Sequence, residues 1–209
     1  MSSLPDLTPT QLDSLKQISY LGMSHATSAL SQLLDHPLDL TVPRVLVLPL
    51  NEIPIHIGGK EELVAGLYLK VRGDIKGNIL ILLPRKSVTS IIRMLTGKTT
   101  THGMILSEEE RSVLKELANI LASAYLTALS NLLKVQLIPS IPGLAFDMAG
   151  AVVDYLLIEL GREGGDAMII ETDFETPKRE VSGRLLLFLD RESMPLLLRL
   201  SPQPHALEP

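Results

Sequence analysis

An internal repeat is the feature that most constrains how this chain folds. The segment GNILILLPRKSVTSIIRML begins at Gly77, and GRLLLFLDRESMPLLLRL begins at Gly183. Four residues recur after a shift of 106 positions: Gly77, Arg85, Ser87 and Arg93 as Gly183, Arg191, Ser193 and Arg199. Neither copy alone could bury much apolar surface, so the repeat predicts two units that share one core.

Each copy begins with the signature of a long helix. Thr8, Pro9 and Gln11 form a capping box, and helical periodicity continues to about residue 34. Ser107 and Glu110 form a second capping box, before a helix that runs to about residue 133. Strand-length apolar segments follow at 44–50, 64–71 and 77–83, then at 144–153, 167–172 and 181–189, and short helices are expected at 86–95 and 192–200.

This order of elements predicts an α+β fold. We expect a pseudo-twofold internal repeat in which two long helices pack on a shared, largely antiparallel β-sheet. The predicted domain covers residues 1–200, with one half at about 8–97 and the other at 107–200. The proline-containing tail, residues 201–209, is expected to be disordered.

Composition excludes several classes of function. Acidic residues outnumber basic ones by 24 to 19 and aromatic residues are only 3%, which argues against nucleic acid as the main partner. The absence of cysteine removes disulfides, zinc–thiolate sites and cysteine nucleophiles, and it fits a cytoplasmic location. The five histidines show no metal-ligand spacing, so no metal site is expected. No apolar run is long enough for membrane insertion, and no signal peptide is evident.

The second long helix carries a narrow polar stripe. At 100° per residue, Ser112, Glu116, Asn119 and Ser123 fall on one side, opposite a leucine-rich face. A carboxylate and an amide three residues apart are common on solvated helix faces, and they are also the chemistry of a catalytic pair. Pro142 follows Asn119 after 22 intervening residues.

The pattern Ser112-x3-Glu116-x2-Asn119, followed by Pro142, resembles the signature of the CheC/CheX/FliY family of chemotaxis phosphatases. The likeness extends over roughly residues 8–200 and is greatest to CheC. Members of this family hydrolyse the aspartyl phosphate of the response regulator CheY. The resemblance therefore implies a protein phosphatase whose partner is a phosphorylated CheY-like regulator.

The resemblance also implies roles for these residues. Asn119 would orient the attacking water, and Glu116 would dock on a lysine of the regulator. Ser112 would be a supporting residue, and Pro142 would shape the entry to the following strand. No cofactor is expected on this chain, because the Mg²⁺ of the reaction would be held by the regulator.

The first copy departs from the family pattern. It reads Asp13-x3-Gln17-x2-Tyr20, with Pro43 after the same 22-residue gap. Gln17 cannot form an ion pair with a lysine, and the phenol of Tyr20 is too long for the place of an amide. We predict one competent site, in the second half, and one degenerate site that serves as scaffold, as a partner surface or only as core.

A non-catalytic role is the alternative. The middle domain of the flagellar switch protein FliM has a related fold without the Glu-x2-Asn pair, so an adaptor that binds a response regulator or CheD is the second hypothesis. CheD is a further candidate partner in either case. A monomer and a homodimer both remain open, and the sequence does not name the regulator.

Overall fold

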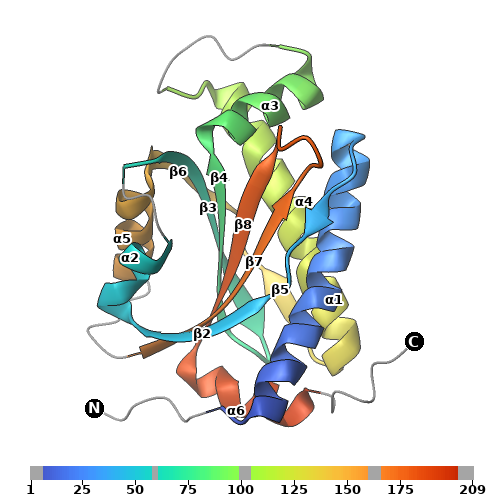
Figure 1. Ribbon diagram of the computed structural model, residues 1–209, viewed down its shortest axis with the longest axis vertical. Coiled ribbons are helices and arrows are strands. Elements are labelled where there is room, and N and C mark those ends of the chain that lie inside the picture. Colours follow the sequence, from blue (N-terminus) through green and yellow to red (C-terminus); the bar gives the residue numbers. More distant parts are fainter. Residues whose placement is uncertain (1–6, 58–60, 99–104, 160–165, 202–209) are drawn as a thin grey trace.

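The same order of elements recurs in the two halves of the molecule (Figure 1). The computed structural model describes residues 7–57, 61–98, 105–159 and 166–201. Its helices are α1 Pro9–Leu34, α2 Ile53–Ile57, α3 Arg85–Thr96, α4 Glu108–Leu133, α5 Ala149–Glu159 and α6 Met194–Leu200. Its strands are β1 Asp39–Leu40, β2 Arg44–Pro49, β3 Leu63–Gly73, β4 Gly77–Pro84, β5 Leu137–Pro139, β6 Gly143–Met148, β7 Asp166–Glu175 and β8 Ser182–Leu189.

The sheet interleaves the two halves. Its order is β1-β7-β8-β4-β3-β5, with β2 also paired to β7 and β6 also paired to β3, and every pairing is antiparallel. The first strands of each half therefore pair with a long strand of the other half, while β4 and β8 meet at the centre. This exchange explains why neither half could form its sheet alone, and it confirms the predicted pseudo-twofold α+β class.

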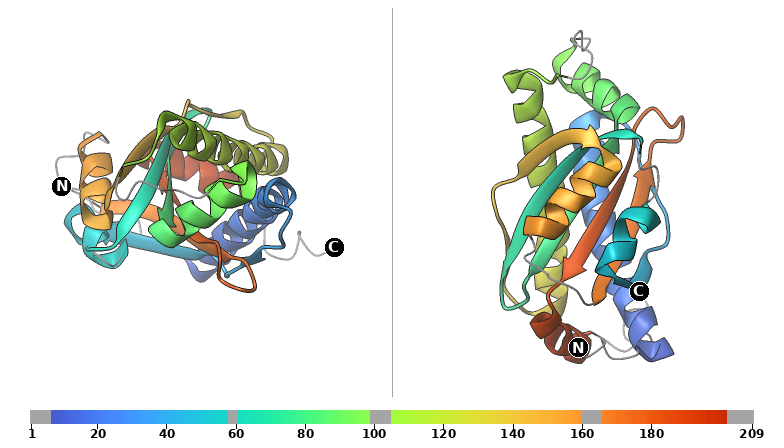
Figure 2. Two further views of the ribbon diagram at one scale, coloured as in Figure 1. Left: turned by 90° about the horizontal axis from the view of Figure 1, so that it is seen from above. Right: turned by 90° about the vertical axis from the view of Figure 1, so that its left-hand side faces the viewer.

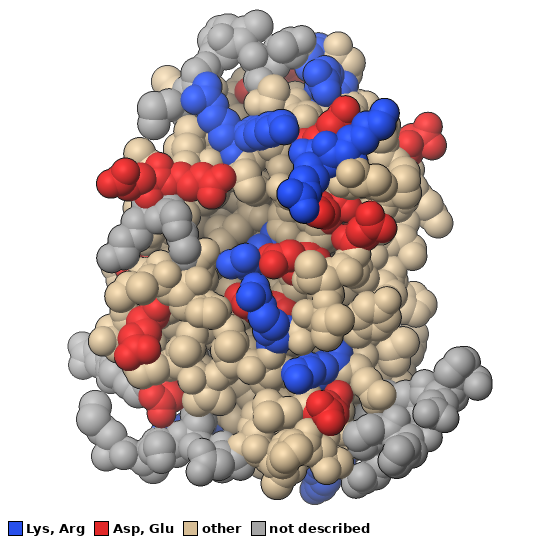
Figure 3. Space-filling model, viewed as in Figure 1, with Lys and Arg blue, Asp and Glu red and all other residues tan. Residues whose placement is uncertain are grey.

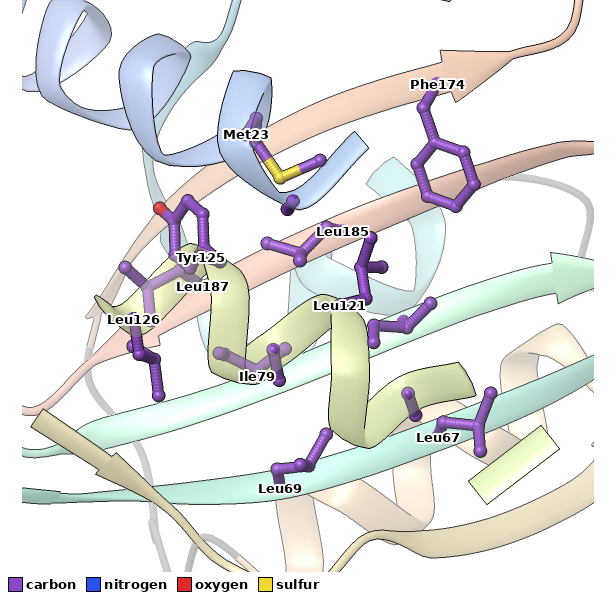
Figure 4. Packing of buried hydrophobic residues seen from close by; sticks show 14 of the residues in the cluster. Met23, Leu67, Leu69, Ile79, Leu121, Tyr125, Leu126, Phe174, Leu185 and Leu187 are labelled. Carbon is purple, nitrogen blue, oxygen red and sulfur yellow. The ribbon is translucent and has the colours of Figure 1, made fainter. Parts of the chain in front are cut away.

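The long helices α1 and α4 run antiparallel and cover one face of the sheet (Figures 1 and 2). They approach closely at Gly22, where an added Cβ would lie 2.7 Å from Cε2 of Tyr125. Tyr125 is fully buried, and its hydroxyl lies 3.2 Å from Oγ of Ser19 across the helix pair. Figure 4 shows Met23 and Tyr125 from the helices packing with Leu67, Ile79 and Leu187 of the sheet.

The other face of the sheet carries α2 and α5, which contact one another (Figure 2). The predicted strand-length segment at 144–153 is wrong in its second part, because β6 ends at Met148 and α5 begins at Ala149. The ladder ends at this point because Met148 pairs with Leu63, the first residue of β3. Gly66 on β3 leaves room for Val152 of α5 to pack directly on the strand, and a Cβ there would lie 2.2 Å from Cγ1 of Val152.

The other long elements agree with the sequence to within a few residues. A short turn at residues 74–76 connects β3 to β4, and both predicted capping boxes are present. The short helix α2 and the short strands β1 and β5 were not predicted. The proposed tail lies outside the described residues except for Ser201, and the boundaries of the two halves stay a prediction.

Candidate active site

Helix α4 supplies a well-anchored platform for the predicted pair. At its start, the backbone N–H of Glu110 donates to Oγ of Ser107, and that of Ser107 donates to Oε2 of Glu110 at 2.7 Å. Its apolar face, with Leu114, Leu117 and Leu121 fully buried, packs against α1 and the sheet. The polar stripe is thereby held on the outer side of a helix that cannot easily rotate or slide.

The predicted residues lie on successive turns of that outer side. Ser112 and Glu116 are exposed, and Asn119 is half-buried beside the core residues Leu117 and Ala118. Within the part of the chain that the structure describes, the side chains of Glu116 and Asn119 make no hydrogen bond or ion pair. Both side chains are thus available to a partner, while their backbone is fixed by the helix.

Pro142 reaches the flank of α4 although it follows Asn119 by more than twenty residues. The backbone N–H of Leu137 donates to Oγ of Ser130 at 3.1 Å, and Nη2 of Arg111 donates to the carbonyl of Leu144 at 3.4 Å. These two bonds hold the segment between β5 and β6 alongside the helix. Pro142 itself is buried, which fits the predicted structural role.

The degenerate motif occupies the equivalent place on α1. Asp13 is exposed and lies 3.9 Å from Nζ of Lys16, Gln17 is half-buried, and Tyr20 is 46% exposed. Pro43 is buried immediately before β2, as Pro142 is before β6. The structure therefore arranges the four motif residues of each half in the same way. The two sets differ in the functional groups that they present.

A buried tyrosine lies behind the candidate site. Burial raises the pKa of Tyr125 to about 12, and its hydrogen bond with Ser19 opposes part of that shift. The hydroxyl therefore stays neutral at physiological pH and links the two long helices. It has no access to a substrate and takes no part in the candidate site.

A second group of charged residues, on the sheet face that carries α2 and α5, was missed from the sequence. Glu171 is only 1% exposed, yet one of its carboxylate oxygens lies 2.6 Å from Nε of Arg44, and the other lies 3.4 Å from Nε2 of His56. Next to it, Asp173 pairs with Arg44 and Arg184. No sequence signal could have found the contacts of Glu171 with Arg44 and His56, because each of these partners lies more than one hundred positions away in the chain.

An open cleft of about 420 Å³ adjoins these charges, and mixed acidic and basic side chains surround a hollow in Figure 3. The charged side chains that line the cleft are largely paired with one another, as in the contact between Arg179 and Glu175 at 3.3 Å. Among the described residues, no three His, Asp or Glu side chains are grouped so that they could hold a metal ion. In the same part of the chain, no helix has the length and apolar character needed to cross a membrane.

Comparison with known proteins points to one family. The model of the CheC-like family matches residues 109–144, which include the whole Ser112–Glu116–Asn119–Pro142 pattern. The CheY-P phosphatase CheC of Bacillus subtilis (strain 168) is 34% identical over 197 residues, covering 92% of this chain and 94% of that protein.

Solved structures show the same fold at lower identity. FliY of Thermotoga maritima superposes with a TM-score of 0.69 at 20% identity, covering 92% of this chain and 96% of that one. The FliM middle domain from H. pylori also has a TM-score of 0.69, at 11% identity, with 93% and 99% covered. At these identities the likeness concerns the fold alone.

Proposed function

Because this chain belongs to the CheC family, we propose that it is a phosphatase that hydrolyses the aspartyl phosphate of a CheY-like response regulator. The Bacillus relative that it matches over nearly its whole length is a CheY-P phosphatase. The observation that carries the proposal for this chain is the exposed Glu116–Asn119 pair on α4. A carboxylate and an amide that have no partner among the described residues are placed to meet the active site of another protein.

Asn119 is the proposed catalytic residue. Its amide can accept a hydrogen bond from a water molecule and donate one to a phosphoryl oxygen, and it carries no charge that would repel the phosphate. A neutral amide is a weak base, so its contribution is to hold the water in line with the phosphorus atom. The half-buried position of Asn119 supports this role, because neighbouring core residues restrict the side chain before the substrate arrives.

Glu116 is the proposed docking residue. It lies three residues before Asn119, a rise of about 4.5 Å along the helix, so one partner surface can contact both. Its carboxylate is exposed and would pair with a lysine on the regulator, which sets the depth and direction of Asn119. Ser112 would support the same contact one turn earlier. We expect Mg²⁺ to be bound by the regulator and this chain to contribute no cofactor.

The first half would then be a scaffold. Tyr20 stands where Asn119 stands in the second half, and a phenol cannot both donate and accept with the geometry of an amide. Gln17 removes the charge that Glu116 supplies. We further expect the protein to act in the cytoplasm; CheD as a partner, and the choice between monomer and homodimer, stay predictions.

The test is inorganic phosphate release from a phosphorylated receiver domain of the same organism. We expect the wild type to accelerate release, and Asn119→Ala to lose at least about 100-fold in kcat while its affinity for the receiver changes little. Glu116→Gln should instead raise KM, because it weakens docking. Tyr20→Ala is the matched control on α1 and should behave as the wild type.

Two results would count against the proposal. If Asn119→Ala retains wild-type activity, the amide does not position the water. If the wild type binds a receiver domain without accelerating phosphate release from it, the outer face of α4 is a docking surface and the protein is an adaptor.

A further inference from the structure

One apolar side chain stands in solvent next to the proposed site. Ile141 is 90% exposed, the most of any large hydrophobic side chain among the described residues. It immediately precedes the buried Pro142. The residue at the same place in the first half, 99 positions earlier, is Val42, which precedes Pro43 and is 70% exposed. Single exposed apolar side chains are common on protein surfaces, but this one projects from a fixed backbone and is therefore placed to contact a partner.

The backbone around Ile141 is held firmly. The N–H of Ser140 donates to the carbonyl of Lys70 at 2.8 Å, and the N–H of Lys70 donates to Oγ of Ser140 at 2.9 Å. On the other side, Gly143 pairs with Tyr68 of β3. Because both neighbours of the Ile141–Pro142 step are fixed to the sheet, the side chain projects from a preorganised position and would lose little backbone entropy on binding.

The same segment brings Ile141 level with Asn119. The bond from Leu137 to Ser130 and the bond from Arg111 to Leu144 attach the segment to α4 at two points. Ile141 lies four residues after the first point and three before the second. Distances along the segment can be compared with distances along α4, at about 3.3 Å per extended residue and about 1.5 Å per helical residue. On this comparison, the point on α4 that lies opposite Ile141 is close to residue 119.

We propose that Ile141 is a docking and specificity-determining residue for the phosphorylated receiver domain, and that it fits an apolar depression beside the phosphorylation site. This inference rests on the proposed function and adds a contact to it. Asn119 would enter the partner's active site, Glu116 would pair with a cation, and Ile141 would anchor the opposite side of the contact. Three different kinds of contact on one rigid surface define a single orientation of the partner.

The size of the apolar surface favours a receiver domain over a second copy of this chain. Among the described residues of this edge, the exposed large hydrophobic side chains are Ile141, Ile138 at 47% and Met148 at 40%, and the outer face of α4 beside them is polar. Stable dimers bury on the order of 1,000 Å² or more with a well-packed apolar centre. A single projecting anchor within a polar surface suits a partner that must bind and leave in each catalytic cycle.

The test uses Ile141→Ser, with Val42→Ser as the matched control in the first half and Ile141→Leu as the conservative variant. Steady-state phosphate release gives KM and kcat, and titration with the beryllofluoride-activated receiver domain gives Kd. We expect Ile141→Ser to raise KM and Kd about tenfold, typical of an interface anchor, with kcat unchanged because the side chain does not touch the reacting atoms. Ile141→Leu should stay within about twofold of the wild type, and Val42→Ser should be indistinguishable from it.

Three outcomes would overturn the inference: no change in binding, an effect on self-association alone, or an equal effect of Val42→Ser. Unchanged KM and Kd in Ile141→Ser would show that the side chain makes no contact with the receiver, while the phosphatase proposal would stand on Asn119. A loss of self-association in sedimentation, without a change in receiver affinity, would assign Ile141 to a dimer contact. If the wild type released no phosphate, the phosphatase proposal would fail, and Kd alone would decide the docking role. An equal effect of Val42→Ser would place the contact in both halves and remove its link to Asn119.

Discussion

Gly77 and Gly183, which occupy equivalent positions in the two repeats, provide a test of how tightly the two halves are joined. Gly77 opens β4 and pairs with Leu189 of β8, at the centre of the sheet. A Cβ added to Gly77 would lie 2.4 Å from the carbonyl oxygen of Phe188, whereas real Cβ contacts are longer than 3.0 Å. The obstacle is backbone, so Gly77→Ala requires the two central strands to move apart.

The cost of that movement can be worked out from the neighbouring hydrogen bonds. The N–H of Lys76 donates to Oγ of Ser193 at 2.7 Å, and the N–H of Asp190 donates to the carbonyl of Lys76 at 3.1 Å. Losing both costs about 1 kcal/mol each, and overpacking adds about 1–3 kcal/mol. Alanine offsets about 0.5–1 kcal/mol of this cost, because it lowers the conformational entropy of the unfolded chain. We expect Gly77→Ala to lower the free energy of unfolding by about 2–4 kcal/mol.

Gly183, the repeat equivalent of Gly77, provides the comparison. A Cβ there would lie 2.4 Å from Cζ of Phe174 and 2.8 Å from Cδ2 of Leu83. These obstacles are side chains, so Gly183→Ala should cost about 0.5–2 kcal/mol once the gain of alanine is included. Phe174→Leu should offset part of this cost in the double variant, while the same substitution should not help Gly77→Ala.

The measurement is urea denaturation followed by circular dichroism, because the chain has no tryptophan for fluorescence. The reasoning is refuted if Gly77→Ala lies within about 1 kcal/mol of the wild type. It is also refuted if Phe174→Leu offsets the cost of both glycine substitutions equally, because the backbone and side-chain obstacles would then be equivalent.

Three further predictions concern the long helices. Tyr125→Phe should lower the free energy of unfolding by about 1 kcal/mol in urea denaturation, because the buried hydroxyl of Ser19 loses its partner. Since burial raises the pKa of Tyr125 from 10.0 to about 12, the unfolded chain releases this proton first, and stability should fall between pH 10 and pH 12. The loss should reach about 3 kcal/mol and be absent in Tyr125→Phe. Ser107→Ala, which removes the cap of α4, should cost about 1 kcal/mol and lower the melting temperature, and an unchanged value would show that the cap is dispensable.

Local patterns were enough to predict the long elements. The capping boxes at Thr8 and Ser107 were found correctly, because each depends on contacts between residues three apart. The segment at 144–153 was predicted incorrectly for the opposite reason. Its alanines and valines suit a strand or a helix, and the choice depends on residues far away in the chain, because β3 begins at Leu63, the partner of Met148, and Gly66 leaves room for Val152.

The sequence by itself determined the repeat, the α+β class, and the presence of a carboxylate and an amide on one helix face. Each of these is a periodicity or a spacing, which depends only on local geometry. Only the tertiary structure decided that the halves exchange strands, that Glu171 is buried against Arg44, and that Ile141 projects, 90% exposed, from a segment bonded to α4. Those relations join residues separated by tens to hundreds of positions, and they arise because the pairing of β4 with β8 and the packing of α1 on α4 allow one arrangement.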